Sequence, residues 1–129
     1  MNKKVAYWFD LANDDLSVAK TMLDNKHYLH VGFMCHLTIE KALKAAVVQA
    51  TGEIPPKTHQ LVKLAQIAQI HEGMTKEQQE LLRELNPLNI EARYPEYKEA
   101  IAQKLNKAKC AQLINQTEEL LCWIKKQLS

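Results

Sequence analysis

The sequence contains few residues that interrupt helices, with three glycines and four prolines among its 129 residues. Its commonest residues, Leu, Ala, Lys, Gln and Glu, all form helices readily. No segment shows the strict alternation of apolar and polar residues that is typical of a strand. These features argue against a β-sheet and favour helices along almost the whole chain.

Cysteine is also scarce, and its three copies are far apart at Cys35, Cys110 and Cys122. An odd number of cysteines without a Cys-x-x-Cys pair is typical of reduced thiols, so we expect a cytoplasmic protein. The net charge of +2 is too small to indicate nucleic-acid binding by itself. Acidic residues soon follow Lys3 and Lys4, so this segment resembles neither a signal peptide nor a membrane span. We therefore expect no membrane contact.

Apolar residues recur at steps of three and four, which predicts helices that each bury one face. Residues 1–129 are expected to form one domain, an all-α, up-and-down bundle of four main helices plus a short extra helix. Breaks are predicted at Asn25-Lys26, at Gly52 and at Pro55-Pro56, and Thr75 with Gln78 forms a capping box. The predicted helices span residues 3–24, 27 or 30 to 51, 59–71 after an N-cap at Thr58, 76 to 86 or 87, and 97 or 101 to 127.

A row of polar side chains lies within the most apolar of these helices. His36, Glu40 and Lys44 are four residues apart, so they share one helix face, and Glu40 precedes Lys44 in the favourable order. Buried charges are costly unless they satisfy one another, a partner chain or a ligand. A solvent-exposed helix face would carry such pairs at little cost, but the apolar neighbours indicate that part of this helix is enclosed. Glu40, Lys41 and Lys44 either line a dimer cleft or bind a nucleotide, or they form an internal ion-pair network that fixes the helix register.

Four short motifs, in order along the chain, resemble the HEPN domain, whose name stands for higher eukaryotes and prokaryotes nucleotide-binding. They are Trp8…Ala12…Asp15-Leu16…Ala19, Glu40-Lys41-Ala42-Leu43-Lys44-Ala45, Pro56…Thr58-His59…Leu61 and Ala92-Arg93-Tyr94-Pro95. The resemblance implies a homodimer with the helical architecture expected above. It also implies a partner, because small prokaryotic members often accompany a minimal nucleotidyltransferase, and many such pairs act as toxin and antitoxin.

The resemblance further implies that active members are metal-independent ribonucleases. Their signature is an Arg followed, after roughly one to two helical turns, by a His near the start of the last helix. This chain lacks the signature, because its arginines are Arg83 and Arg93 and its last histidine is His71. We therefore expect a binding module that takes a nucleotide or RNA. The alternative is a ribonuclease toxin with a non-standard set, in which Arg93 holds phosphate and His59 or His36 is the base.

Candidate binding residues follow from phosphate and base chemistry. Arginine binds phosphate bidentately, a tyrosine ring stacks on a base, and the start of a helix attracts anions. For each of these features, packing, capping or an ion pair is the structural alternative. His27 and His30 could form half of a metal site, but no further ligands complete it, so we expect neither metal nor cofactor. The predicted ligand-binding residues are Glu40, Lys41, Lys44, Lys57, His59, Arg93, Tyr94 and Tyr97.

Overall fold

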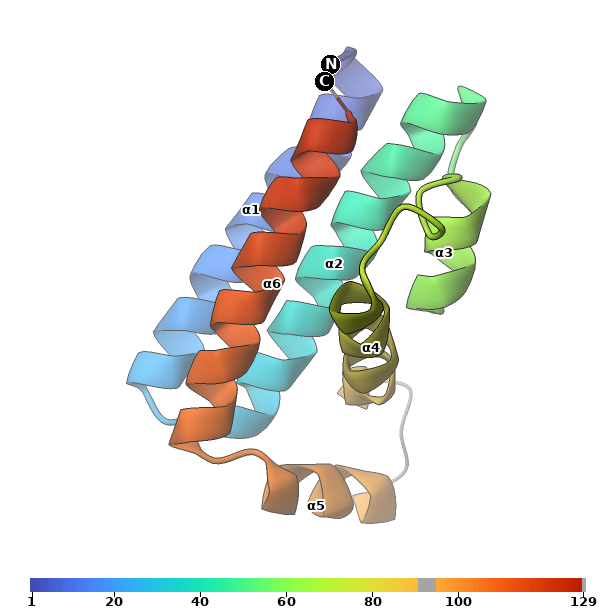
Figure 1. Ribbon diagram of the computed structural model, residues 1–129. Coiled ribbons are helices and arrows are strands. Elements are labelled where there is room, and N and C mark those ends of the chain that lie inside the picture. The colour runs from blue at the N-terminus through green and yellow to red at the C-terminus, as the bar shows by residue number, and fades with distance from the viewer. Residues whose placement is uncertain (91–94, 129) are drawn as a thin grey trace.

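The computed structural model describes residues 1–90 and 95–128, and every regular element in this part of the chain is helical (Figure 1). The all-α prediction is therefore confirmed. Within the same residues, no helix combines the length and the apolarity that crossing a membrane requires. The elements are α1 (Lys3–Asp24), α2 (Tyr28–Thr51), α3 (Leu61–Ile67), α4 (Lys76–Leu85), the 3-10 turn η1 (Asn86–Leu88), α5 (Pro95–Lys104) and α6 (Lys107–Gln127).

Helix α2 is the centre of the fold. It packs against α1 and α6 on one side and against α3 on the other, while α5 crosses the end of the bundle near the start of α6 (Figure 1). Because α2 has neighbours on most faces, fifteen of its residues are buried, including His36, Glu40 and Lys44. The polar row predicted from the sequence thus lies inside the protein.

Capping residues set the boundaries of three helices, α1, α2 and α4. The side chain of Asn2 accepts a hydrogen bond from the Val5 N–H at 2.9 Å and caps α1. Gly52 ends α2 in the left-handed conformation, at φ 71°, which glycine adopts without the steric cost of a Cβ. The capping box of Thr75 and Gln78 is present at the start of α4.

The predicted third helix, residues 59–71, was wrong at both ends, because α3 spans only Leu61–Ile67. The Thr58 hydroxyl accepts a hydrogen bond from the Gln60 N–H at 3.2 Å, which forms a local turn instead of a helix cap. The Leu61 N–H donates to the Asn86 side-chain oxygen at 3.0 Å, so a distant residue caps the helix. After α3, Gln69 adopts φ 62° and prevents the helix from continuing.

The predicted final helix was also wrong, since two helices, α5 and α6, replace one continuous helix. Asn106 lies between them in an extended conformation and accepts a hydrogen bond from the Lys109 N–H at 2.8 Å. This side-chain cap starts α6 anew. Apolar spacing continues across the break, which explains why periodicity alone predicted a single helix.

Candidate functional site

The candidate site centres on the carboxylate of Glu40, halfway along α2. One oxygen, Oε1, accepts hydrogen bonds from His36 Nε2 at 3.1 Å and from His59 Nδ1 at 2.9 Å. The other, Oε2, accepts from Lys44 Nζ at 3.0 Å. These four side chains are called the Glu40 cluster below. The cluster joins the predicted row on α2 to His59, which lies in the loop between α2 and α3.

The cluster is deeply enclosed apart from His59. Glu40 is 4% exposed and His36 is not exposed at all, whereas the His59 side chain is 60% exposed. Lys44 Nζ also lies 5.5 Å from the centre of the Trp8 ring, a cation–π distance. The cluster therefore links the centre of α2 to α1 through Trp8 and to the protein surface through His59.

Glu40 is strongly acidic in this setting. Burial raises the pKa of its carboxyl group, but the hydrogen bonds from His36, His59 and Lys44 together outweigh burial and lower the pKa from 4.5 to about 2. The carboxylate is therefore ionised at neutral pH, and both of its oxygens are engaged within the chain.

His36 has an acceptor at each ring nitrogen. Nδ1 lies 3.0 Å from the Leu85 carbonyl oxygen, and Nε2 lies 3.1 Å from the ionised carboxylate of Glu40. Both ring nitrogens are therefore engaged within the chain, and the ring is fully buried, so His36 has no nitrogen free for a ligand. Through these two contacts it fastens the end of α4 to α2.

His59 has a different geometry from His36. Its Nδ1 bonds to Glu40, while Nε2 has no hydrogen-bond partner among residues 1–90 and 95–128. A carboxylate that accepts from Nδ1–H holds the neutral ring in the tautomer whose lone pair is on Nε2. His59 is therefore the member of the cluster that could meet a ligand or accept a proton from one.

Two other predicted residues lie away from the cluster. Lys41 pairs with Asp15 of α1 at 2.6 Å, which accounts for its charge within the fold. Tyr97 lies on α5 and lines a separate cavity of about 560 Å³, together with Leu88 and Leu113. The site residues proposed from the sequence thus do not gather in a single place.

The remaining predicted residues are less informative. Lys57 is exposed in the loop before His59, and Arg93 and Tyr94 lie outside the described residues. On α6, Lys109 pairs with Glu84 of α4. The described part of the chain contains no group of three or more His, Cys, Asp or Glu side chains arranged to hold a metal ion.

Sequence reasoning missed the bond between Glu40 and His59, and it also missed two contacts that surround the cluster. The acceptor for His36 Nδ1 is the backbone oxygen of Leu85, and any residue type supplies such an oxygen. The position of Trp8 over Lys44 depends on how α1 packs on α2. Since neither contact has a sequence signal, only the folded arrangement reveals them.

Two solved structures have the same fold as this chain. The first is described as the crystal structure of TT1696 from Thermus thermophilus. It is 20% identical with a TM-score of 0.79, and the match covers 98% of this chain and all of that one. The second, ST0689, is described as an archaeal HEPN homologue. It is 20% identical with a TM-score of 0.69, and the match covers both chains completely. Among curated proteins, no match was found.

The family model of the HEPN domain matches residues 5–127, which is nearly the whole sequence. The match agrees with the helical fold and with the four motifs found along the chain. This protein therefore belongs to the HEPN domain family.

Proposed function

We propose that this chain is a homodimeric HEPN binding module that pairs with a minimal nucleotidyltransferase, in a two-gene system of the toxin–antitoxin kind, and that it does not cleave RNA. Membership of the HEPN family supports the dimer and the partner. The absence of cleavage is inferred because no histidine follows either arginine, Arg83 or Arg93, anywhere in the sequence. The ribonuclease signature of the family cannot form at any spacing without that histidine. What remains is the scaffold and its capacity to bind.

The Glu40 cluster supports a binding role over a catalytic one. Both carboxylate oxygens of Glu40 and the ammonium group of Lys44 are engaged within the chain. Groups held in such a network act as a rigid support, because moving any one of them leaves a buried charge without its partner. The cluster then holds the loop before α3 in place, so that Lys57 and His59 are presented at the surface to a phosphate of a nucleotide or RNA.

One observation favours a second candidate, a ribonuclease with a non-standard catalytic set. The bond from His59 Nδ1 to Glu40 leaves Nε2 of an exposed imidazole without a partner among the described residues. A histidine oriented in this way by a carboxylate can take the proton from a ribose 2′-hydroxyl, which then attacks the adjacent phosphate. Arg93 would neutralise the charge that develops on the phosphate oxygens.

An RNA cleavage assay separates the two candidates. The purified protein is incubated with single-stranded RNA in excess chelator, and the products are examined for cyclic phosphate ends. We expect intact RNA. Cleavage that is lost in His59→Gln and in Arg93→Ala, but retained in the control His30→Gln on another exposed histidine, would establish the ribonuclease and overturn the proposal. Glutamine can still donate a hydrogen bond to Glu40, so a loss of cleavage in His59→Gln would show that His59 acts as the base.

Binding is measured separately by isothermal titration calorimetry with nucleoside triphosphates and with single-stranded RNA. We expect saturable heat for at least one of them, weakened by the double variant Lys57→Gln, His59→Gln. If neither ligand gives heat, the nucleotide or RNA part of the proposal fails, and the charged row serves only the fold.

A further inference from the structure

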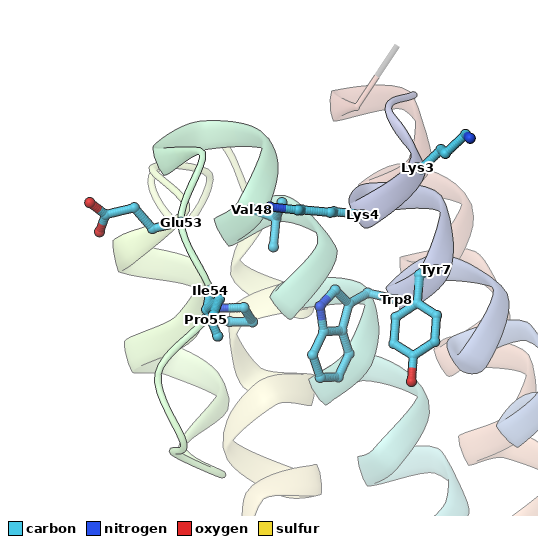
Figure 2. A pocket seen from close by; sticks show the side chains of 8 residues that line it. All are labelled: Lys3, Lys4, Tyr7, Trp8, Val48, Glu53, Ile54 and Pro55. Atoms are coloured by element: carbon cyan, nitrogen blue, oxygen red, sulfur yellow. The ribbon is translucent and has the colours of Figure 1, made fainter.

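Trp8 also lines a second surface feature, which is separate from the Glu40 cluster. A cleft of about 330 Å³ opens between the first turns of α1 and the loop that follows α2 (Figure 2). Its apolar lining comes from Tyr7 and Trp8 on α1, from Val48 on α2 and from Ile54 and Pro55 in the loop. None of the Glu40 cluster residues lines it.

The rim of the cleft exposes apolar side chains to an unusual degree. Ile54 is 88% exposed, the most of any large apolar residue in the described chain, and Tyr7 on the opposite wall is 59% exposed. Single exposed apolar residues are common, but two that line the same apolar cleft are typical of an interaction surface. Tyrosine and tryptophan are also among the residues that contribute most at protein interfaces.

The loop that carries Ile54 is anchored on both sides of it. Gly52 begins the loop in a left-handed turn, Pro55 is buried against the bundle, and His59 is bonded to Glu40 at 2.9 Å. On the other wall, the ring of Trp8 lies against the ammonium group of Lys44. A surface that is already ordered loses little conformational entropy on binding, which favours affinity.

Three charged residues line the cleft, Lys3, Lys4 and Glu53, so its lining carries a net positive charge. Neither lysine has a carboxylate within 4.0 Å among the described residues. In Figure 2, Lys4 reaches across toward Val48, whereas the side chain of Lys3 and the carboxylate of Glu53 both point away from Trp8. Both lysines also lie in the first turn of α1, where the helix dipole disfavours cations and no acidic residue offsets them. An acidic partner would relieve this repulsion.

We propose that this cleft binds a segment of a partner protein that carries one large apolar side chain flanked by acidic residues. The apolar side chain would insert between Trp8 and Ile54, and the acidic residues would pair with Lys3 and Lys4. A nucleotide fits less well, because the lining offers few polar groups for the edge of a base. The inference goes beyond the proposed function, since it holds whether or not the chain pairs with a nucleotidyltransferase.

A random peptide library displayed on phage tests the chemistry of the partner without presupposing its identity. The full chain is the bait, and enriched peptides are synthesised for titration by fluorescence anisotropy. We expect a consensus with one Leu, Ile, Met or aromatic residue between Asp or Glu residues, and binding that weakens as salt is added. Ile54→Glu, at an exposed position that the fold does not need, should weaken binding at least tenfold, as should the double variant Lys3→Glu, Lys4→Glu.

The matched control is Val18→Glu, which places the same charge on an exposed apolar residue near the far end of α1 and should leave binding unchanged. The proposal is overturned if no peptide is enriched, if the enriched peptides lack acidic residues, or if they bind Ile54→Glu as tightly as the original chain. If ATP or oligouridylate displaced the bound peptide, the cleft would be assigned to a nucleotide instead, and the proposal would be overturned. A change in oligomeric state with Ile54→Glu, measured by sedimentation, would assign the cleft to a second copy of this chain.

Discussion

Replacing Glu40 with glutamine removes the negative charge that holds the centre of the fold together. Folding lowers the pKa of this carboxyl group from 4.5 to about 2, and each pKa unit corresponds to about 1.36 kcal/mol, so ionised Glu40 contributes about 3 kcal/mol at neutral pH. The figure agrees with the cost of about 3–5 kcal/mol for breaking a buried ion pair. We therefore expect Glu40→Gln to lower the free energy of unfolding at pH 7 by about 3 kcal/mol.

The pH dependence of this loss follows from the direction of the pKa change. Because the folded-state pKa of Glu40 lies below the unfolded value, its contribution is fully present above pH 4.5 and is lost as the pH falls toward 2. The difference in stability between the original chain and Glu40→Gln should therefore shrink steadily across this window. Other carboxyl groups titrate in both proteins and largely cancel from the difference.

The assay is urea unfolding followed by far-ultraviolet circular dichroism, at one fixed protein concentration and at several pH values. Glu118→Gln is the matched control, because it removes an ion pair between Glu118 and Lys20, two side chains that are each about half exposed. Such a pair contributes less than about 1 kcal/mol. If Glu40→Gln were no more destabilising than the control, or if the difference did not change between pH 5 and pH 2, the assigned role of the cluster would be refuted.

Three further predictions concern the fold. Thr75→Ala removes the cap of α4 and should lower the free energy of unfolding by about 1 kcal/mol. Thr58→Ala is the control, because Thr58 caps no helix and its loss should cost less. An equal loss of stability in the two variants would contradict the cap assignment. Gly32→Val should cost about 1–3 kcal/mol in thermal or urea unfolding, because a Cβ there would stand 3.0 and 3.2 Å from two leucine methyl groups. Cys35 and Cys110 are buried, and burial raises the pKa of the Cys35 thiol to about 11, whereas Cys122 is exposed. Ellman's reagent should therefore modify Cys122 rapidly, and Cys122→Ser should abolish the fast phase of this reaction.

Where a boundary depends on neighbouring residues alone, the sequence predicts it well. Residues 3–24 form α1 as predicted, and Gly52 ends α2, because the cap residues act on their own helix. The start of α3 was missed because Asn86, twenty-five residues away, caps Leu61. No local pattern contains that information.

The same distinction applies to the candidate site. The spacing of His36, Glu40 and Lys44 placed them on one face of a helix, and the structure joins them by hydrogen bonds. Their connection to His59 and to Trp8 depends on the packing of three separate segments. Lys41 follows Glu40 directly in the sequence, but it pairs with Asp15 on α1, so its position next to Glu40 does not predict its partner.

The proposed function requires this chain to assemble with a minimal nucleotidyltransferase. Native mass spectrometry of the chain, co-expressed and purified with a minimal nucleotidyltransferase from the same genome, measures the composition of that assembly directly. We expect an assembly that contains two copies of the 14.8 kDa chain bound to the transferase. A 14.8 kDa monomer that leaves the transferase free would contradict the claim.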